Sequence, residues 1–456
     1  MTQPVAPDCT PPEVVAPNGG AAPAPRGHSA RNVDKLTMLA ATGARLMVGM
    51  LTFIILARFL GPTGYGVIAS AIAYCTFASM LSDFGFGTSG LRQAAADVEN
   101  SPRIIGDAIA TKMVLFLLVT VAGGLIAVAA LPAAWLPVFA LIHLGTTANG
   151  LSEMSLIAAR ARRRFTLEAR LVLSSSAMML LILGSVTALT RSLLAAAVAF
   201  ALTRILYLLM VRVSLRGWLE PLTRMRRSRA EIRAVLRGGR GFAADSVLTS
   251  LSGQVDVLMF AALLPIHQFG VYQAGARLSQ VFVSFAPVLS SVYLPGLSAA
   301  AIKRDDEGFR AESRRLSLEF AGLAVLGGLG FLIVGPWLTP WLYGDGYADL
   351  TALWPGFAAF ALLRFGASGF GIQLAALAHV RTRIMSSMLS IAILVALTAA
   401  FLPRLGLPAA PLLLAMGAVP SIIMLGTMLA RDRRSSRVVR VTLPVLLAAA
   451  MGIVLI

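Results

Sequence analysis

FIILARFLGPTGYGVIASAIAY, residues 53–74, is an apolar run that carries one arginine, breaks at Gly61-Pro62 and becomes apolar again. Proline fixes φ and glycine permits positive φ, so the Gly-Pro-x-Gly sequence predicts a tight turn between two apolar helices. Arg58 would close the first helix at a membrane interface, where its long side chain reaches water. The stretch therefore predicts a helical hairpin in a membrane.

Composition extends this pattern to the whole chain. The 456 residues are 57% hydrophobic with a mean hydropathy of +0.80, and 13% are charged, against about 25% in soluble domains. The apolar runs are about 20 residues long, enough to cross a hydrocarbon core of about 30 Å as a helix. We expect spans over 36–57, 66–90, 107–130, 135–157, 171–190, 192–211, 241–264, 271–300, 316–335, 351–377, 384–402 and 408–429, with a shorter apolar run over 441–456.

The basic residues are distributed unevenly between the two sides. Of the 39 Lys and Arg residues, 32 fall in the gaps on the N-terminal side, counting Lys112 at a span edge, and 3 in the opposite gaps. Such asymmetry marks the cytoplasmic side, so we expect a cytoplasmic N-terminus. The net charge of +18 then faces anionic lipid rather than nucleic acid. We read RARRRF (160–165) and RMRRSR (224–229) as topology determinants.

A weak internal repeat divides the spans into two halves. LGPTGYGVIASA (60–71) aligns with LPIHQFGVYQAG (264–275) at an offset of 204, which carries the first span onto the seventh. Six spans per half is an even number, so the repeats run parallel, and substrate sites in such transporters lie between the halves. We expect a disordered cytoplasmic tail over 1–30, an N-terminal lobe over 31–211, a basic cytoplasmic linker over 212–240, a C-terminal lobe over 241–430, and a basic loop with an apolar segment over 431–456.

Polar residues inside the spans follow helical spacing. A charge at mid-bilayer costs about 2.5–3.5 kcal/mol on insertion scales, so such residues usually face a wet cavity. Ser and Thr at these positions can instead join packed helices, and Glu153 lies near a span end, where it can reach the interface. The candidates for a cavity are Arg45, Arg204, Gln273, Arg277, Gln280 and Arg364, with the carboxylates Asp83, Asp245 and Asp256.

Three segments resemble one protein family. ARFLGPTGYGVIASAIA (57–73) and LSDFGFGTSGLRQAA (81–95) are similar to the start of bacterial polysaccharide transporters, and PWLYGDGYADLTALWPGFAA (340–359) is similar to a loop of that family. These proteins are O-antigen and exopolysaccharide repeat-unit flippases of the multidrug/oligosaccharidyl-lipid/polysaccharide (MOP) exporter superfamily. The resemblance implies two six-helix bundles, twelve core spans in all. The apolar run 441–456 follows them and leaves room for a short thirteenth segment, whose placement the sequence leaves open.

The resemblance also implies a substrate and a location. The substrate would be an undecaprenyl-diphosphate-linked oligosaccharide, carried across the bacterial inner membrane by rocking of the two bundles. Arg45, Arg277 and Arg364 would bind the diphosphate, because arginine binds phosphate oxygens in bidentate fashion. The implied partners are this lipid, membrane lipids and other polysaccharide-assembly proteins. We expect no metal, cofactor or nucleic acid, since no Cys/His spacing is typical of a metal site.

Three alternatives remain open. A cation-coupled drug or metabolite antiporter of the same superfamily would use Asp83, Asp245 and Asp256 as ion-coupling groups. A lipid-linked peptidoglycan precursor flippase is another relative. A membrane polysaccharide polymerase is disfavoured, because the longest outer gap, 336–350, has no paired-carboxylate pattern, and we expect a protein that is not an enzyme.

One pairing is also predicted from depth. At 1.5 Å per residue, Asp256 lies about 22 Å from the inner end of its span and Arg277 about 9 Å from the outer end of the next. In a core of about 30 Å these depths nearly coincide. We therefore expect the two side chains to face one cavity and to pair in one state of a transport cycle.

Overall fold

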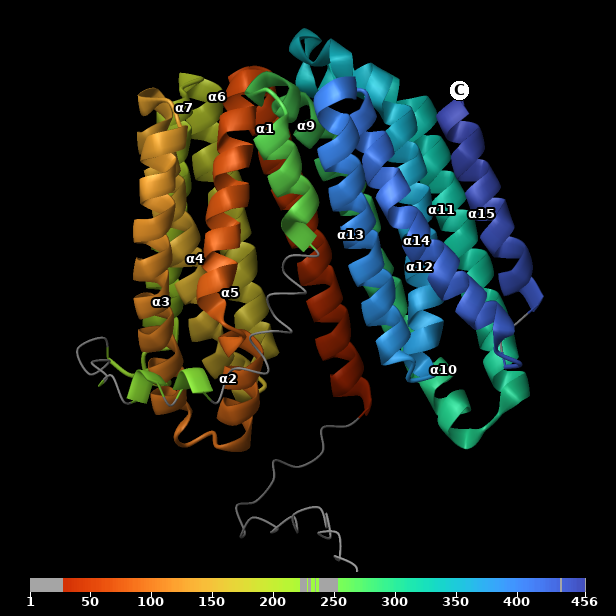
Figure 1. The fold of residues 1–456 in the computed structure, drawn as a ribbon. Helices are drawn as coiled ribbons and strands as arrows, with labels where there is room; N and C mark the ends of the chain where they lie inside the picture. Colours follow the sequence, from red (N-terminus) through yellow and green to blue (C-terminus); the bar gives the residue numbers. More distant parts are fainter. Residues whose placement is uncertain are drawn as a thin grey trace, which may run out of the picture.

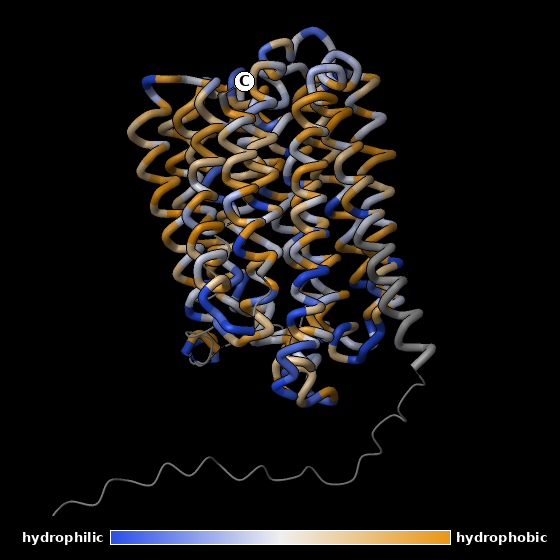
Figure 2. The backbone as a smooth tube through the Cα atoms, turned by 90° about the vertical axis from the view of Figure 1, so that its right-hand side faces the viewer, coloured by the Kyte–Doolittle hydropathy of each residue, from blue (hydrophilic) through white to orange (hydrophobic). Residues whose placement is uncertain are grey.

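The structure is a computed structural model that describes residues 28–221, 228, 231–233, 235–237, 253–434 and 437–455. These residues are almost wholly helical and include no strand. In this part of the chain eight helices, or nine if one bent pair counts as a single span, are long and apolar enough to cross a membrane. Figure 2 shows hydrophobic residues along the middle of the helices and hydrophilic residues toward their ends. The prediction of an all-α membrane protein is confirmed.

The first helix, α1 (His28–Asp83), doubles back at the predicted turn. Gly61 has φ 68° and ψ 175°, a region that is essentially restricted to glycine. Figure 1 shows the chain rising along the first arm, 28–60, and descending along the second, 62–83. We call the end of the molecule that holds this turn the outer end, because the charge distribution predicts that it faces away from the cytoplasm.

The N-terminal bundle contains α1 and the helices that follow it. Their bounds are α2 (Phe86–Ala96), α3 (Ser101–Ala130), η1 (Ala133–Trp135), α4 (Leu136–Ala161), α5 (Phe165–Met178), the π-helix η2 (Met179–Gly184), α6 (Ser185–Thr190) and α7 (Leu193–Ser214). The expected span 66–90 is wrong in its inner part, because Phe84 (φ 42°) and Gly85 (φ 72°) break the helix. The predicted fifth span is one continuous helix, Phe165–Thr190, made of α5, η2 and α6.

The C-terminal bundle repeats this layout. It contains a helix over Gly253–Leu263, then α9 (Ile266–Val283), α10 (Ala286–Lys303), α11 (Asp306–Tyr343), η4 (Asp345–Leu353), α12 (Trp354–Ala376), α13 (Val380–Leu405), α14 (Ala409–Arg431) and α15 (Arg437–Leu455). The chain bends by 42° within α10, between Ile266–Ser290 and Val292–Lys303, so the second span of each half is broken near its inner end. Figure 1 shows the two bundles side by side, with α1 and α9 between them.

The C-terminal apolar segment forms a helix, α15, that belongs to this bundle. Helix α15 packs against α11, α12 and α14. Its buried residues Val439, Leu446, Ala450 and Ile453 recur at helical spacing. Apolar residues on the opposite side, among them Met451, are exposed, as expected for a helix that faces lipid.

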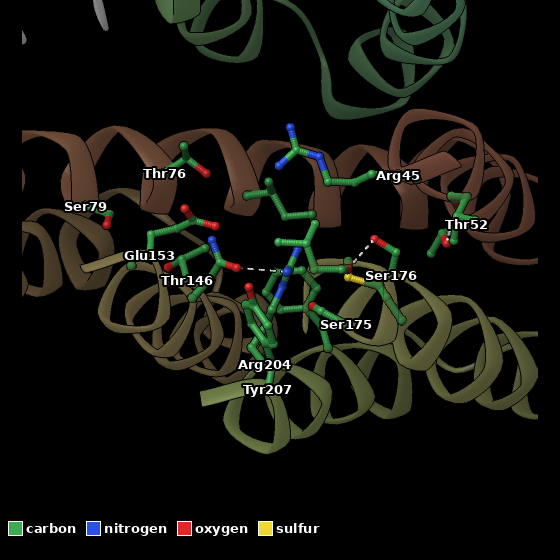
Figure 3. A pocket seen from close by; sticks show the side chains of 18 of the residues that line it. Arg45, Thr52, Thr76, Ser79, Thr146, Glu153, Ser175, Ser176, Arg204 and Tyr207 are labelled. Atoms are coloured by element: carbon green, nitrogen blue, oxygen red, sulfur yellow. Dashed lines mark hydrogen bonds between the residues drawn. The ribbon is translucent and has the colours of Figure 1, made fainter. Parts of the chain in front are cut away.

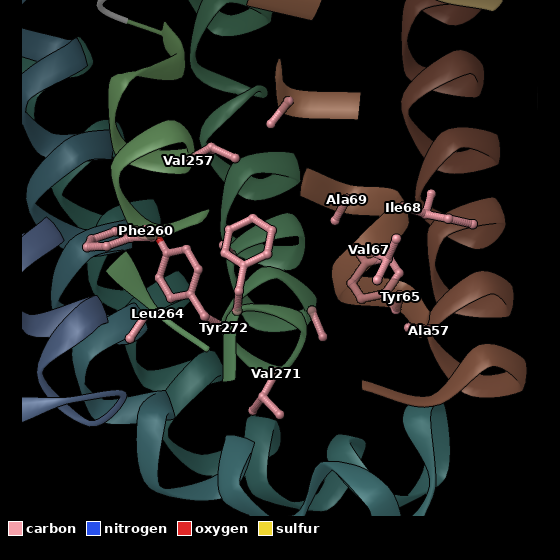
Figure 4. Packing of buried hydrophobic residues seen from close by; sticks show 14 of the residues in the cluster. Ala57, Tyr65, Val67, Ile68, Ala69, Val257, Phe260, Leu264, Val271 and Tyr272 are labelled. Atoms are coloured by element: carbon pink, nitrogen blue, oxygen red, sulfur yellow. The ribbon is translucent and has the colours of Figure 1, made fainter. Parts of the chain in front are cut away.

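The two bundles share one hydrophobic core at the outer end. Tyr65 and Val67 from α1 belong to the same buried cluster as Phe260, Val271 and Tyr272 from the C-terminal bundle. Figure 4 shows these side chains along α1 and the neighbouring helices of the C-terminal bundle. The close approach of α1 and α9 therefore depends on apolar burial.

Arg58 has a role beyond the predicted one. Its guanidinium donates hydrogen bonds to the carbonyl oxygens of Trp341 and, at 3.3 Å, Leu342. These carbonyls belong to the last turn of α11, where backbone acceptors have no partner within the helix and a cation is favoured by the helix dipole. In return, the Tyr347 hydroxyl donates to the Ala57 carbonyl at 2.9 Å. The arginine before the turn therefore joins the two bundles rather than only reaching water.

Candidate functional site

A polar cavity of about 410 Å³ lies inside the N-terminal bundle, lined by both arms of α1 and by α4, α5, η2 and α7. The two arms of α1 contribute residues 45–53 and 72–83, which is possible because the hairpin brings them side by side. Figure 3 shows many of the polar side chains that line it. The polar lining residues are Arg45, Thr52, Thr76, Ser79, Asp83, Thr146, Asn149, Glu153, Ser175, Ser176, Arg204 and Tyr207.

Two arginines that line this cavity have no carboxylate partner among the described residues. The Nη1 atom of Arg204 donates to Asn149 Oδ1 at 2.9 Å, and its guanidinium lies 5.5 Å from the centre of the Phe200 ring. Its buried Nε atom has no hydrogen-bond partner among the described residues. No described Asp or Glu lies within ion-pair distance, 4.0 Å, of Arg204 or Arg45. Within the described part of the chain, these two permanent cations therefore have no counter-charge at ion-pair distance.

The carboxylates of the cavity, by contrast, have basic partners. Asp83 forms an ion pair with Lys112, whose side chain is only 2% exposed, whereas that of Asp83 is 35% exposed. An added Cβ at Gly150 would lie 2.7 Å from Lys112 Nζ, so the glycine makes room for the ammonium group. Lys112, which we expected at a span edge, lies inside the bundle, where Asp83 compensates its charge.

Glu153 belongs to the site rather than to the membrane interface. It lines the large cavity and also a smaller one of about 140 Å³, which shares Asp83 and Gly150 with it. Arg160 pairs with Glu153 at 3.0 Å and with Glu168 at 2.7 Å. The seven-residue spacing between Glu153 and Arg160 places both on one side of α4. This spacing was the feature of the sequence from which their pairing could have been predicted.

The remaining candidates that the structure describes lie in the C-terminal bundle. The Arg277 guanidinium is 4.4 Å from the centre of the Phe53 ring, and Phe53 lines the large cavity. Arg277 also donates to Gln280 Oε1 at 3.5 Å. Gln273 is fully buried, and neither of its amide atoms has a partner among the described residues. Arg277 thus lies beside the large cavity at the contact between the bundles.

Asp256 lies within the electrostatic reach of two arginines, Arg277 and Arg364. No ion pair within 4.0 Å joins Asp256 to Arg277 in this conformation. Arg364 is exposed on α12. Asp245, the third candidate carboxylate, lies outside the described residues. The predicted pairing of Asp256 with Arg277 therefore stays a prediction for another state.

This arrangement suits an anionic, hydroxylated molecule. Arginine and hydroxyl groups together can bind oxyanions and sugar hydroxyls. In the described part of the chain, no cluster of three or more His, Cys, Asp or Glu side chains could hold a metal ion.

The sequence matches the model of one protein family. A family model described as polysaccharide biosynthesis protein matches residues 34–301. No curated protein matches the sequence significantly.

Solved structures match over almost the whole chain. The lipid II flippase MurJ in an inward closed conformation aligns with a TM-score of 0.69 at 12% identity, over 92% of this chain and 91% of that one. An inward-facing multidrug resistance MATE transporter of the MOP superfamily aligns at 0.59 and 12% identity, over 91% and 98%. A MOP superfamily transporter from Pyrococcus furiosus, whose binding pocket is described as having reverse polarity, aligns at 0.56 and 12% identity, over 90% and 95%. At these identities the likeness concerns the fold.

Proposed function

The chain belongs to the family of polysaccharide biosynthesis proteins, and on that premise we propose that it is a flippase for polyprenyl-diphosphate-linked oligosaccharides in the bacterial inner membrane. Its fold is that of MOP superfamily transporters. Neither a diphosphate nor an oligosaccharide crosses a bilayer core unaided, since polar groups are costly there. A protein cavity that replaces the lost hydration is the physical requirement for such transport.

The observation that carries this proposal is the charge balance of the large cavity. Its carboxylates have basic partners, since Lys112 pairs with Asp83 and Arg160 pairs with both Glu153 and Glu168, whereas Arg45 and Arg204 have no acidic partner among the described residues. A diphosphate would supply the missing negative charge, and the hydroxyl groups of the lining would face the sugars. Arg277 lies beside Phe53 at the edge of this cavity, where it extends the cationic surface toward the second bundle.

The transport step follows from the two-bundle architecture. The head group would enter from the cytoplasmic side, while the polyprenyl tail stays in lipid. Rocking of one bundle against the other would then expose the site on the outer side, as in other transporters built from parallel repeats. The N-terminus would be cytoplasmic, as the 32 basic residues on that side predict.

The same charge balance weighs against a cation-coupled antiporter. Such a protein needs an acidic group that binds a free cation. Asp83 is paired with the Lys112 ammonium group, and Glu153 with Arg160, which it shares with Glu168. The N-terminal cavity therefore favours an anionic cargo.

Flipping can be measured in proteoliposomes. The probes are a fluorescent undecaprenyl-diphosphate trisaccharide and, for comparison, lipid II. Replacing Arg45 or Arg204 with Ala should slow flipping of the trisaccharide lipid by about 10- to 100-fold, because each hydrogen bond to a charged group is worth about 1.5–3 kcal/mol. Arg204→Lys should restore only part of the rate, since lysine lacks the bidentate geometry.

The matched control is Arg92→Ala, which removes an arginine exposed on α2 and should leave the rate unchanged. Wild-type rates in both Ala variants at normal reconstitution would refute the binding role. Flipping of lipid II in preference to the trisaccharide lipid would assign the protein to peptidoglycan synthesis instead.

A further inference from the structure

The two copies of the internal repeat touch each other across the bundle interface. The second arm of α1 begins at Pro62 and α9 begins at Ile266, positions that the repeat offset of 204 makes equivalent. Thr63 Oγ1 and His267 Nδ1, also equivalent, lie 3.2 Å apart. Contacts between equivalent residues are expected on a two-fold axis, so this axis passes between the beginnings of the two helices.

Two glycines make the contact possible. A Cβ atom added at Gly66 would clash with the carbonyl oxygen of Ile266, and one added at Gly270 would clash with that of Pro62. Gly66 and Gly270 are again equivalent under the same offset. Small residues permit close approach of helix backbones in membranes, and Cα–H groups contribute weak hydrogen bonds to facing carbonyls. The packing is therefore reciprocal: each glycine receives the backbone of the other helix.

Further bonds between the bundles surround this contact at the outer end. Arg58 binds the end of α11, and the Tyr347 hydroxyl donates to the Ala57 carbonyl. Gly346 of η4 lies beside Pro62. In this conformation the outer ends of the bundles are thus held together by backbone packing as well as by side chains.

We propose that segments 62–66 and 266–270 form a self-complementary clasp that closes the outer side of the protein and must separate in each transport cycle. The transport cycle in this statement rests on the proposed function, but the contact between the two segments does not. A residue larger than glycine at either centre would force the outer ends apart. Because the contact is reciprocal, substitution at Gly66 or at Gly270 should have the same effect.

The first test measures the distance between the outer ends without any substrate. Spin labels are placed at Ala134→Cys in η1 and Arg404→Cys in α13, both exposed at the outer end, with Cys9 and Cys75 replaced by Ala. Double electron–electron resonance should show a longer distance in Gly66→Ala and in Gly270→Ala. The ratio of short to long distances should fall about tenfold, since one added methyl group in a packed interface is costly.

The control is Gly123→Ala in α3, where an added Cβ would meet no atom within 4 Å, and it should leave the distances unchanged. Unchanged distances in both folded interface variants would overturn the clasp. Because no transport is measured, this result is independent of whether the flippase proposal holds.

The second test closes the clasp with a metal and avoids packing defects. In Thr63→His, the native His267 supplies a second imidazole within reach of one Zn²⁺ ion. Zinc should then favour the short distance and block flipping of the trisaccharide lipid, and EDTA should reverse both effects. Neither wild type nor Thr63→His/His267→Ala should respond. Measured zinc binding to Thr63→His with free separation of the outer ends would refute the proposal.

Discussion

Replacing Asp83 with Asn should destabilise the protein more than replacing its partner, Lys112. The pair lies in the wall of the N-terminal cavity, with the lysine side chain 2% exposed and the aspartate side chain 35% exposed. Removing one partner of a buried ion pair typically costs about 3–5 kcal/mol, because the other charge remains buried and uncompensated. Asp83 faces the cavity, where water screens part of the interaction, so we expect the lower end, about 3 kcal/mol.

The opposite substitution leaves a different charge behind. In Lys112→Met an apolar chain of similar length fills the buried space, and the remaining carboxylate keeps contact with the cavity. Its loss of stability should be about 1 kcal/mol, within the range for partly exposed ion pairs. The double variant should resemble Lys112→Met alone, because no unpaired ammonium group remains.

The free energy of unfolding can be followed in mixed micelles by circular dichroism during titration with sodium dodecyl sulfate. All variants are compared with wild type under one lipid and salt condition. An Asp83→Asn loss no larger than that of Lys112→Met would refute the reasoning. So would additive losses in the double variant, because independent sites add and paired sites do not.

Three further predictions concern the turn, the C-terminal core and the topology. Gly61→Ala should lower the free energy of unfolding by about 1–3 kcal/mol, because alanine is strained at this backbone conformation. The control Gly123→Ala should not lower it. Equal thermal melting curves for the two variants would contradict this prediction. Gln373 is fully buried and hydrogen-bonded to two serines of α11. Gln373→Met should therefore lower the free energy of unfolding by about 1–3 kcal/mol, measured as a lower midpoint in the same detergent titration. An unchanged midpoint would contradict a stabilising role of these hydrogen bonds. A single cysteine at Ser228 should resist an impermeant maleimide in intact cells, while one at Ala134 should react, and the reverse pattern would invert the predicted orientation.

The spans could be predicted from the sequence because bilayer length selects apolar runs directly. The turn at Gly61 could be predicted for a similar reason, since it depends on four adjacent residues. The break at Phe84 was missed, because a left-handed phenylalanine has no sequence signature comparable to Gly-Pro-x-Gly. Local sequence thus predicts the elements better than their interruptions.

The site was harder to predict, because its partners are far apart in the chain. Lys112 pairs with Asp83 over 29 residues, and Arg204 meets Asn149 over 55. Arg58 binds a carbonyl 284 residues away. A sequence shows that a charge lies in or near an apolar run, but it does not show which other charge compensates it. For this reason the sequence indicated only that Arg58 reaches water, and not that it joins the two bundles.

The two-fold contact between the repeats has the geometry of an isologous interface, the kind that joins identical subunits of a symmetric dimer. In such a dimer, any residue on the axis meets a copy of itself, so one substitution changes both sides at once. In a single chain the two sides are separate codons and can diverge. Thr63 and His267 show the result, since a hydroxyl faces an imidazole at equivalent positions. Because the two halves are covalently linked, equivalent positions at the axis can carry different, complementary side chains. Hydrogen bonds near the axis can also form on one side only. The bonds of Arg58 are an example, since in a symmetric dimer they would occur twice.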